Sequence, residues 1–370
     1  MAIPDAPEKD KRIILSGMRP TGELHLGNFE GVLRNWIELQ NTSRCFYFVA
    51  DWHALTSELD TRQIGKYSLD MVADWLAFGV DPYKSTLFIQ SSVPEHAELS
   101  LILERLVNIG TLERLPTYKG YLEHLAGDRK IWEGKDENRN EASIGKKVKA
   151  KLLEGDERLA AIARAEVSLG FLAYPVLQAA DILLYDTTHV PVGEDQLPHV
   201  ELTREIARKF NRTYGELFVV PEVLLGEAKR IRGADGRKMS KSYDNELLPS
   251  YGLAEIDQRI RQTITNRPQL TSKGDPYECP VYDLQRIFNQ EQEIEIGRAC
   301  REASIGCFDC KMKLPGKITA AYESYRENRA KISEDYVKDV LREGNKIANV
   351  VAKEKMSQVK EMMLMGYLKR

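Results

Sequence analysis

Short apolar runs alternate with longer amphipathic stretches over the first ninety residues of the chain. The runs at 13–16, 45–50 and 86–90 are rich in β-branched and aromatic residues, as expected of strands buried on both faces. Between them, the stretches at about 27–39 and 63–78 repeat their apolar positions at helical spacing. Strands that alternate with helices predict βαβ units and therefore a parallel sheet.

The same alternation is interrupted and then resumes. Charged residues crowd into 119–166, which predicts an inserted segment whose simplest role is a surface excursion. Beyond it, 173–185 and 198–210 are predicted to be helices on either side of an extended run at 189–192.

The chain is predicted to be mostly helical after about residue 245. One apolar stripe at helical spacing runs through 337–351, and such a stripe indicates core packing and not a binding site. The expected fold is a Rossmann-type α/β domain over 1–248 that carries the charged insert, followed by an all-helical domain over 249–370.

Polar residues with useful chemistry follow the predicted strands. In a parallel sheet, ligands bind at the carboxyl ends of the strands, and both 17–28 and 51–53 begin at such ends. His25, Gly27 and Asn28 lie where the first helix starts, and a helix N-terminus offers free N–H groups and a positive dipole end to an anion.

A lysine-rich loop is predicted at 238–242, behind Gly233 and Gly236. Alone, its sequence Lys-Met-Ser-Lys-Ser is typical of a solvated turn. Lysines supply point charges for phosphates. Paired with the helix start at His25 and Asn28, the loop therefore predicts a triphosphate site that is held from two sides.

Bulk properties narrow the class of protein. The 370 residues carry a net charge of −3 with a pI of about 6.2, so the chain as a whole is not basic enough to indicate nucleic-acid binding. From residue 311 to 370, however, 14 Lys and Arg face 8 Asp and Glu, which suits a polyanion partner or, equally, a solvated helix face. No apolar run approaches the ~20 residues that span a bilayer. The N-terminus lacks the apolar segment of a signal peptide, so a cytoplasmic protein without a membrane or DNA partner is expected.

Four of the five cysteines are clustered in sequence: Cys279, Cys300, Cys307 and Cys310. In a cytoplasmic protein such a set indicates a metal site and not a disulfide framework. Four thiolates suit either a tetrahedral Zn²⁺ or a [4Fe–4S] cluster, and the spacing does not choose between them. Cys45 lies in a predicted strand and is expected to be core.

Five ordered motifs resemble those of bacterial tryptophanyl-tRNA synthetases, which are class I aminoacyl-tRNA synthetases. They are 16–22 together with 25–28, 50–56, 174–175 together with 179–183, 190–196, and 238–242. The resemblance extends from about Arg12 to the C-terminus apart from the insert. It implies activation of L-tryptophan by Mg-ATP to tryptophanyl-adenylate and pyrophosphate, transfer of tryptophan to tRNA(Trp), and a homodimer.

Three alternatives remain beside this function. Tyrosyl enzymes share the architecture and some of the residues, so a tyrosine–tRNA ligase is the near neighbour. A non-catalytic synthetase-like RNA-binding protein would not need His25, Asp181 and both loop lysines together. Another nucleotidyltransferase of the same superfamily would not need the basic helical C-terminal region.

The resemblance implies a catalytic set and an ATP-binding set. His25, Asn28 and Arg19 are implied to act on the phosphate side. Lys238 and Lys241 are implied to follow charge onto the leaving pyrophosphate, which helps only if they bind the transition state better than the ground state. The residues implied in ATP binding are Arg19, Pro20, Thr21, Gly27, Asn28, Gly193, Glu194, Asp195, Ile231, Lys238, Met239, Ser240, Lys241 and Ser242.

The resemblance also implies a tryptophan pocket. Asp181 is implied to accept the indole N–H, and Tyr174 and Gln196 to hold the α-amino group. Taken on their own, Asp181 could be a satisfied core acid and His53 a core histidine. The implied pocket residues are Leu15, Gly17, His53, Tyr174, Gln178, Asp181, Val190, Val192 and Gln196.

Gln178 departs from the tryptophanyl pattern, in which an apolar side chain is common at this position. The series Tyr174, Gln178 and Asp181 is reminiscent of tyrosyl enzymes. Leu15, however, stands where tyrosyl enzymes usually place a tyrosine that binds the phenol hydroxyl. A site that reads a hydroxyl needs polar partners, so tryptophan remains the expected substrate.

For the cysteines, the resemblance favours the [4Fe–4S] cluster over zinc. Some tryptophanyl-tRNA synthetases carry such a cluster on a similar series of four cysteines. Its implied role is structural, as a staple of the helical domain near the surface that reads the anticodon.

Overall fold

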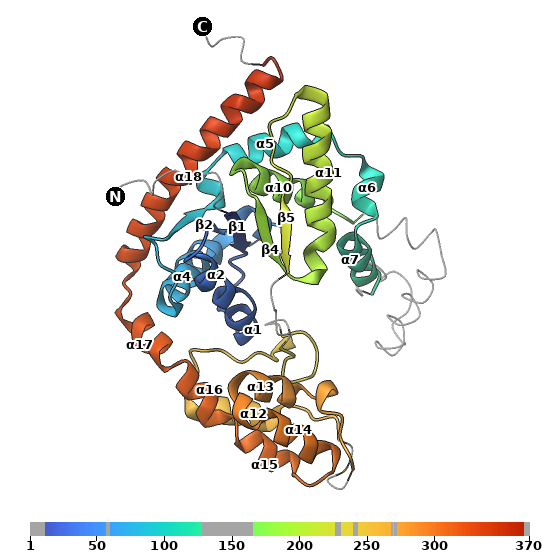
Figure 1. The fold of residues 1–370 in the computed structure, drawn as a ribbon, viewed down its shortest axis with the longest axis vertical. Helices are drawn as coiled ribbons and strands as arrows, with labels where there is room; N and C mark the ends of the chain where they lie inside the picture. The colour runs from blue at the N-terminus through green and yellow to red at the C-terminus, as the bar shows by residue number, and fades with distance from the viewer. Residues whose placement is uncertain are drawn as a thin grey trace. The chain divides into compact units, whose positions relative to one another are not determined.

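The computed structural model describes residues 12–56, 60–127, 166–225, 231–239, 243–267, 269 and 272–365 (Figure 1). Most of the predicted insert, from 128 to 165, lies outside these residues.

The chain divides into two compact units. The first comprises Met1–Asp51, Asp60–Ile89 and Leu224–Ile347, and the second comprises Trp52–Leu59, Gln90–Val223 and Ala348–Arg370. The domain boundary expected after residue 248 stays a prediction.

The sheet has five strands in the order β3-β2-β1-β4-β5. They are β1 Ile13–Met18, β2 Arg44–Val49, β3 Ser85–Ile89, β4 His189–Val192 and β5 Glu222–Leu225. In the first unit, β1 pairs in parallel with β2, and β2 with β3, so that Leu15 lies opposite Phe46 and Tyr47 opposite Leu87. The predicted parallel strands are confirmed, and their nearly continuous apolar sequences suit strands that are covered on both faces.

The helix predicted after β1 is built in three pieces. They are α1 (Leu26–Asn28), a π-helical turn (Phe29–Leu33) and α2 (Arg34–Leu39). Glu30 in the π-helical turn is buried and accepts hydrogen bonds from Arg34 and from the hydroxyl of Tyr322. Single π-helical turns occur mostly inside α-helices and often at functional sites.

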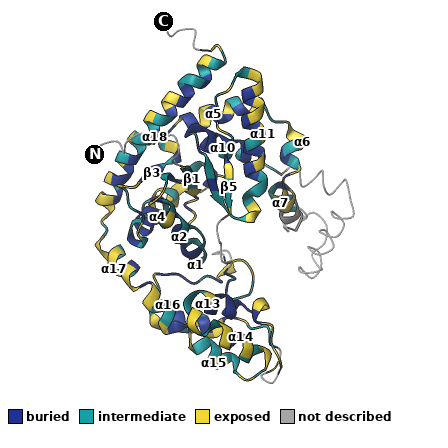
Figure 2. Cartoon of the chain, viewed as in Figure 1, coloured by how far each residue is buried: buried dark blue, intermediate teal, exposed yellow. Residues whose placement is uncertain are grey.

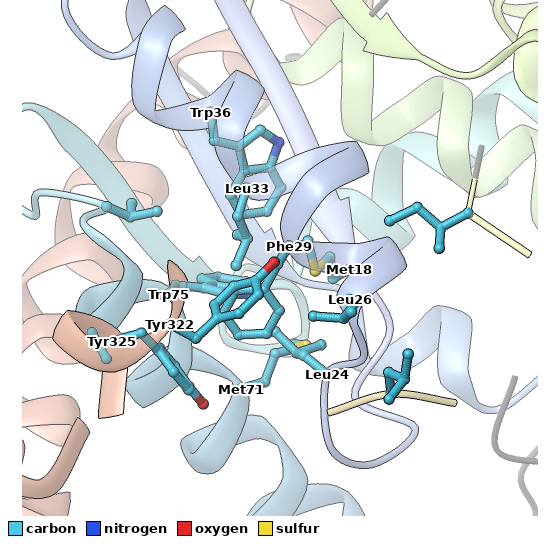
Figure 3. Packing of buried hydrophobic residues seen from close by; sticks show 14 of the residues in the cluster. Met18, Leu24, Leu26, Phe29, Leu33, Trp36, Met71, Trp75, Tyr322 and Tyr325 are labelled. Carbon is cyan, nitrogen blue, oxygen red and sulfur yellow. The ribbon is translucent and has the colours of Figure 1, made fainter. Parts of the chain in front are cut away.

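Aromatic side chains anchor this helical run in the first unit. Phe29 packs edge-on against Tyr322 and Tyr325, with ring centroids 5.8 and 4.9 Å apart (Figure 3). Trp75, from α4 (Ile64–Phe78), and Leu26 belong to the same buried cluster. The helix start beside His25 therefore rests on a packed core.

The second unit is built around one apolar helix. Its helices are α5 (Glu95–Glu104), α6 (Ile109–Glu113), α7 (Pro116–Gly127), α10 (Leu169–Leu184) and α11 (Leu197–Tyr214). Ser168 begins α10 by accepting a hydrogen bond from the backbone N–H of Phe171 at 3.1 Å. The second half of α10 is buried, whereas α11 has one buried and one exposed face (Figure 2).

The chain beyond residue 245 is mostly helical, as predicted. The helices are α12 (Leu253–Gln262), α13 (Pro280–Phe288), α14 (Glu293–Arg301), α15 (Cys307–Met312), α16 (Pro315–Ala321), α17 (Glu323–Lys331) and α18 (Glu334–Met362). Val337, Leu341 and Ala348 are buried, which confirms the apolar stripe of α18 as core. Among the described residues, no helix is long and apolar enough to cross a membrane.

Candidate functional site

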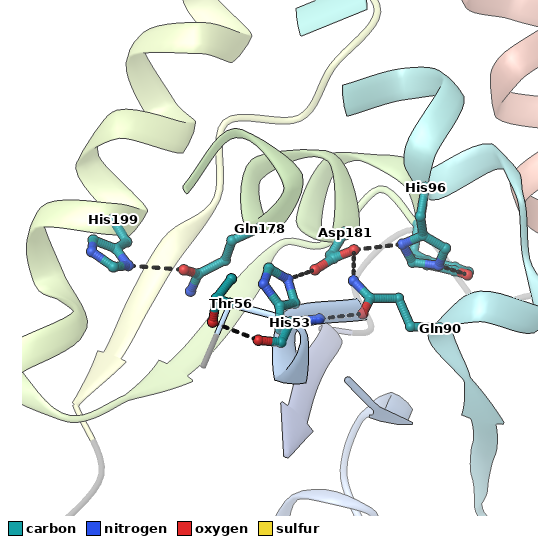
Figure 4. Close-up of polar contacts among 8 residues, drawn as sticks. His53, Thr56, Gln90, His96, Gln178, Asp181 and His199 are labelled. Carbon is teal, nitrogen blue, oxygen red and sulfur yellow. Dashed lines mark hydrogen bonds and ion pairs between the residues drawn. The ribbon is translucent and has the colours of Figure 1, made fainter. Parts of the chain in front are cut away.

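Asp181 is the centre of a buried hydrogen-bond network in the second unit (Figure 4). Its side chain lies near the end of α10 and is 1% exposed. Oδ1 accepts from Gln90 Nε2 at 2.9 Å and from His96 Nδ1 at 2.6 Å, and Oδ2 accepts from His53 Nε2 at 2.7 Å. A carboxylate offers about four lone-pair positions. The described residues therefore occupy three of them, and one position on Oδ2 remains.

The network keeps Asp181 ionised. Burial alone would raise the pKa of this carboxyl group, but the charges and hydrogen bonds of His53 and His96 outweigh burial and hold its pKa well below the usual range. Because a carboxylate only accepts, the protons in these two contacts belong to His53 Nε2 and His96 Nδ1. Asp181 can therefore be both a hydrogen-bonded core acid and a ligand acceptor, because three of its acceptor positions are used within the protein and one remains.

His96 is also bonded on its far side. Its Nε2 lies 2.8 Å from the hydroxyl of Tyr185, and both side chains are buried. Burial, with the charges of Asp181 and Glu95, raises the pKa of Tyr185 well above its usual value. Sequence reasoning selected neither residue, nor Gln90, although Gln90 and His96 follow the carboxyl end of β3, where ligand groups are expected.

His199 on α11 organises a second polar group in the same unit. Its Nδ1 lies 2.9 Å from Gln178 Oε1, and its Nε2 lies 3.0 Å from Thr117 Oγ1 and 3.3 Å from the hydroxyl of Tyr174. Burial lowers the pKa of His199 to about 4, with Asp195 raising it and His53 lowering it further. A neutral ring in this geometry donates from Nδ1 to Gln178 and accepts at Nε2.

The other predicted pocket residues divide between the units. Val190 is buried in β4, and Val192 and Gln196 are half-buried beside it in the second unit. Leu15 and Gly17 lie on β1 in the first unit, where Leu15 is buried and Gly17 packs against the ring of Phe48. Structure thus brings His53, Gln178, Asp181 and Tyr174 into linked networks within one unit.

In the first unit, a hydrogen bond joins the two sides of the predicted phosphate site, which are the start of α1 and the chain just beyond the lysine-rich loop. The backbone N–H of His25 donates to Asn28 Oδ1 at 3.0 Å, which caps the helix start. The N–H of Leu26 donates to the carbonyl of Leu247 at 2.8 Å, just beyond the lysine-rich loop. Met239 is 3% exposed and lies in the same buried cluster as Leu26, so it anchors the loop in the core.

The remaining predicted nucleotide residues are placed as follows. Arg19 and Thr21 are exposed in the turn after β1, with Pro20 buried between them, while Gly27 is the second residue of α1. Ile231 is buried and Lys238 is exposed, whereas Ser240, Lys241 and Ser242 lie outside the described residues. In the second unit, Gly193, Glu194 and Asp195 form a turn that the hydrogen bond from Gln196 N to the Gly193 carbonyl closes at 3.0 Å.

The base of the lysine-rich loop is firmly held. Asn245 is 1% exposed and donates to Asp235 Oδ1 at 2.6 Å and to the carbonyl of Lys238 at 3.2 Å. The guanidinium group of Arg237 lies 3.8 Å from the ring centroid of Tyr243. These contacts join the two ends of the loop.

All four clustered cysteines line one pocket of the first unit. Burial raises the pKa of the Cys310 thiol to about 12, while a hydrogen bond from Gln285 lowers it. Gln285 is fully buried and donates to the Cys310 carbonyl at 2.7 Å and to its sulfur at 3.5 Å. Cys45 is 1% exposed in β2, as expected of a core residue.

The four cysteines are not arranged around a single ion. Within the described ranges, no group of three or more His, Cys, Asp or Glu side chains could hold one metal ion. The pocket that the sulfurs share is lined by Arg267 as well. Burial raises the pKa of Cys300, while the charge of Arg267 lowers it in part.

Known proteins resemble the chain over nearly its whole length. A family model described as "tRNA synthetases class I (W and Y)" matches residues 8–132 and 143–323. A protein of Thermotoga maritima named tryptophan–tRNA ligase is 43% identical over 358 residues, covering 95% of this chain and 98% of that protein. A protein of Aquifex aeolicus with the same name is 40% identical over 391 residues, covering 95% and 99%. The structure of tryptophanyl-tRNA synthetase from Campylobacter jejuni complexed with ADP and tryptophan has a TM-score of 0.73 at 31% identity, and covers 95% of this chain and 99% of that one.

Proposed function

Because the chain belongs to the class I synthetases for tryptophan and tyrosine and is a tryptophan–tRNA ligase, we propose that the indole ring of L-tryptophan binds beside Asp181. The observation that carries this assignment is a buried carboxylate that holds three donors and has capacity for a fourth. An indole N–H completes such a set. An amino acid without that donor would leave the acceptor unpaired, at a cost of ~1–3 kcal/mol.

The rest of the pocket supports tryptophan over tyrosine. His53, Val190 and Val192 are proposed to line the indole ring, and Tyr174 and Gln196 to hold the α-amino group. The carbonyl oxygen of Gln178, which raised the tyrosyl alternative, accepts a hydrogen bond from the neutral ring of His199. One of the two lone pairs of that oxygen is therefore already used within the protein.

The nucleotide is proposed to bind at the start of α1. Asn28 Oδ1 caps the helix, which leaves its amide nitrogen to donate to a phosphate beside His25 and Arg19. Lys238 and Lys241 are proposed to approach the leaving pyrophosphate from the loop that Met239 anchors. Gly27 is proposed to contact the adenosine moiety, and the turn at 193–195 stays a predicted ribose-binding turn.

The chemistry follows from ATP as substrate. An oxygen of the tryptophan carboxylate bonds to the α-phosphorus, the bond to the bridging oxygen breaks, and pyrophosphate leaves, with Mg²⁺ balancing its charge. A ribose hydroxyl at the end of the tRNA then attacks the carbonyl carbon of the adenylate, and AMP leaves. The protein supplies positioning and charge in both steps and no covalent intermediate.

A [4Fe–4S] cluster is proposed at the four cysteines. Around one Zn²⁺, thiolates 2.3 Å from the metal would lie only about 3.8 Å from one another. What supports a common ligand is that all four cysteines line one shared pocket. Cys279, Cys300, Cys307 and Cys310 would be its ligands, and the cluster would tie α13, α14 and α15 together without taking part in the reaction.

The proposal also covers the helical region, the oligomeric state and the location of the protein. The helical region over 249–370, whose last sixty residues are basic, is proposed to bind the anticodon end of tRNA(Trp). The insert near 119–166 has no assigned role. A homodimer that acts in the cytoplasm is proposed on the resemblance alone, and light scattering of the purified protein would test the oligomeric state.

Pyrophosphate exchange into ATP tests the amino-acid assignment. The wild-type protein is expected to exchange with tryptophan and not with tyrosine. Asp181→Ala is expected to lose the preference for tryptophan over phenylalanine while ATP binding persists, because the substitution removes the indole acceptor and none of the residues proposed to bind ATP. Asp74→Ala is the matched control, since Asp74 is also a buried carboxylate but is paired with Tyr325 and Arg329 in the first unit.

Two outcomes would contradict the assignment. Exchange with tyrosine would mean that Tyr174, Gln178 and Asp181 recognise the phenol hydroxyl of tyrosine. Full tryptophan preference in Asp181→Ala would mean that the indole N–H is recognised elsewhere.

A further inference from the structure

We propose that Tyr185 and His96 form a two-step hydrogen-bond relay that orients Asp181, and that this relay sets the preference for substrates with an indole N–H. Both are positioning residues: they act through Asp181 and do not touch the substrate. The inference rests on the proposed role of Asp181 as the indole acceptor. It adds two residues that no part of the sequence pattern singled out.

His96 is hydrogen-bonded on both ring nitrogens. Asp181 is ionised and accepts from His96 Nδ1 at 2.6 Å, so Nδ1 carries a proton. On the other side of the ring, Nε2 lies 2.8 Å from the hydroxyl of Tyr185, which keeps its proton because burial and the charges of Asp181 and Glu95 oppose its ionisation. Contacts on both nitrogens fix the orientation of the ring.

Tyr185 matters because its hydroxyl holds the far side of the His96 ring. In Tyr185→Phe the 2.8 Å contact at Nε2 is lost, and the ring is held less firmly. Nδ1 can then turn away from the carboxylate of Asp181, which weakens the 2.6 Å hydrogen bond between them.

The relay is shielded from solvent. His96 is 0% exposed and Tyr185 is 2% exposed, so bulk water does not reach their contact. Together with Gln90 on the same oxygen, His96 ties Oδ1 to the protein, which leaves Oδ2 as the oxygen that faces His53 and the remaining acceptor position. If His96 stops donating, Oδ1 competes for the same donors and the carboxylate is no longer held in one orientation.

The relay thus controls a difference in affinity between two ligands. A carboxylate held in one orientation raises the affinity for a ligand with an N–H and lowers the affinity for a ligand that leaves the acceptor unpaired. A carboxylate that can rotate or take up a proton reduces both effects. The quantity to measure is therefore a ratio of two substrates, because general structural damage lowers the numerator and denominator together.

The test uses the full-length protein in pyrophosphate exchange, with tryptophan and with 3-(3-benzothienyl)alanine, in which sulfur replaces the ring N–H. The ratio of their kcat/KM values is expected to fall roughly tenfold in Tyr185→Phe, the effect of about one charge-assisted hydrogen bond, while the KM for ATP is unchanged. Tyr47→Phe is the matched control. Tyr47 is also a buried tyrosine whose hydroxyl donates a hydrogen bond, to the carbonyl of Trp36 at 2.9 Å in the first unit, and its variant is expected to keep the wild-type ratio.

A second pair of variants separates positioning from packing. In His96→Asn the amide nitrogen can take the place of Nδ1 and still donate to Asp181, so the ratio is expected to be largely retained. In His96→Gln the amide nitrogen takes the place of Nε2 instead, and the ratio is expected to fall as in Tyr185→Phe. This pair decides the question even if Tyr185→Phe does not fold.

The outcomes are distinguishable from failure of the pocket assignment. If Asp181→Ala loses the substrate ratio but His96→Gln and Tyr185→Phe keep it, the relay is overturned and the pocket assignment stands. If Asp181→Ala also keeps the ratio, the assignment of Asp181 fails and the relay fails with it. A fall in kcat/KM for both substrates by the same factor in His96→Gln would show that His96 is only a packing residue.

Discussion

His199 shows how burial sets the charge of a single side chain. Its ring has partners on both nitrogens, and these partners suit only the neutral form, which donates from Nδ1 and accepts at Nε2. Protonation would turn the accepting nitrogen into a donor opposite Thr117 and Tyr174 and would place a charge in a buried position. The pKa of His199 is lowered to about 4 for this reason.

The lowered pKa predicts an acid-sensitive fold. The unfolded chain takes up a proton on this residue near pH 6.5, whereas the folded chain does so only near pH 4, so the contribution of His199 is complete above pH 6.5 and is lost as the pH falls toward 4. The loss would reach roughly 3 kcal/mol in free energy of unfolding. Urea unfolding at a series of pH values from 7 to 4.5 measures the slope.

His199→Asn is expected to flatten that slope, because asparagine does not titrate and its amide nitrogen can replace Nδ1 as the donor to Gln178. His189→Asn serves as the control, since His189 is partly exposed next to Glu222. An equal slope in His199→Asn and in the wild-type protein would refute the explanation.

At the residue scale, the sequence predicted Asp181 as an acceptor but did not predict His96 and Tyr185, which hold its carboxylate in place. Asp181 and His53 lie within contiguous motifs, so local order was sufficient to select them. His96 and Tyr185 become neighbours only because α5 and α10 pack together, and their contact joins positions 89 residues apart. No local spacing encodes such a contact, which is why the relay could not be predicted.

At the scale of elements, the edge of the sheet depends on one glycine. β3 is the edge strand, and exposed strand edges are prone to pair with other chains. In the first unit α18 covers it: Asn345 Oδ1 accepts from the N–H of Ile89 at 2.9 Å. A Cβ atom on Gly344 would lie 1.7 Å from the carbonyl oxygen of Leu87, so only glycine allows the helix to approach this closely.

Gly344→Ala is therefore expected to destabilise the protein by ~1–3 kcal/mol or more, because the backbone of Leu87 cannot yield as a side chain would. Thermal and urea unfolding measure the change. Gly65→Ala is the matched control: Gly65 also lies in a helix, α4, but a Cβ atom there would meet nothing within 4 Å. That variant is expected to gain about 0.5–1 kcal/mol from helix propensity. Equal effects of the two substitutions would exclude the close contact as the cause.

Periodicity located most elements of the α/β part to within a few residues, because buried strands and amphipathic helices leave strong patterns. It missed β5 (Glu222–Leu225), which has exposed residues at both ends and is only four residues long. It also took Gly344 as one more member of an apolar stripe. The close approach to β3 is a tertiary constraint that a stripe of apolar positions does not reveal.

At the scale of the whole molecule, the two units are not consecutive in sequence. Segments of the chain alternate between them, and α18 contributes to both. Composition along the chain changes too gradually to reveal such an arrangement, so the sequence suggested a simple succession of an α/β region and a helical region. The cysteine pocket, by contrast, was foreseeable, because four thiols spread over 32 positions are unusual without a common ligand.

The cysteine pocket leads to a prediction for the stability of the molecule. The double variant Cys307→Ser and Cys310→Ser is expected to lose bound iron and sulfide and to unfold at a lower temperature, because α13, α14 and α15 would lose their common ligand. Iron, sulfide and zinc content of anaerobically purified protein, visible absorption and thermal unfolding measure the effect. Cys45→Ser makes the same chemical change at a buried thiol in β2 and is expected to keep the full iron content. If the wild-type protein binds zinc and no iron, the four cysteines hold a single ion and not a cluster. If it binds neither metal, the four thiols are packing residues.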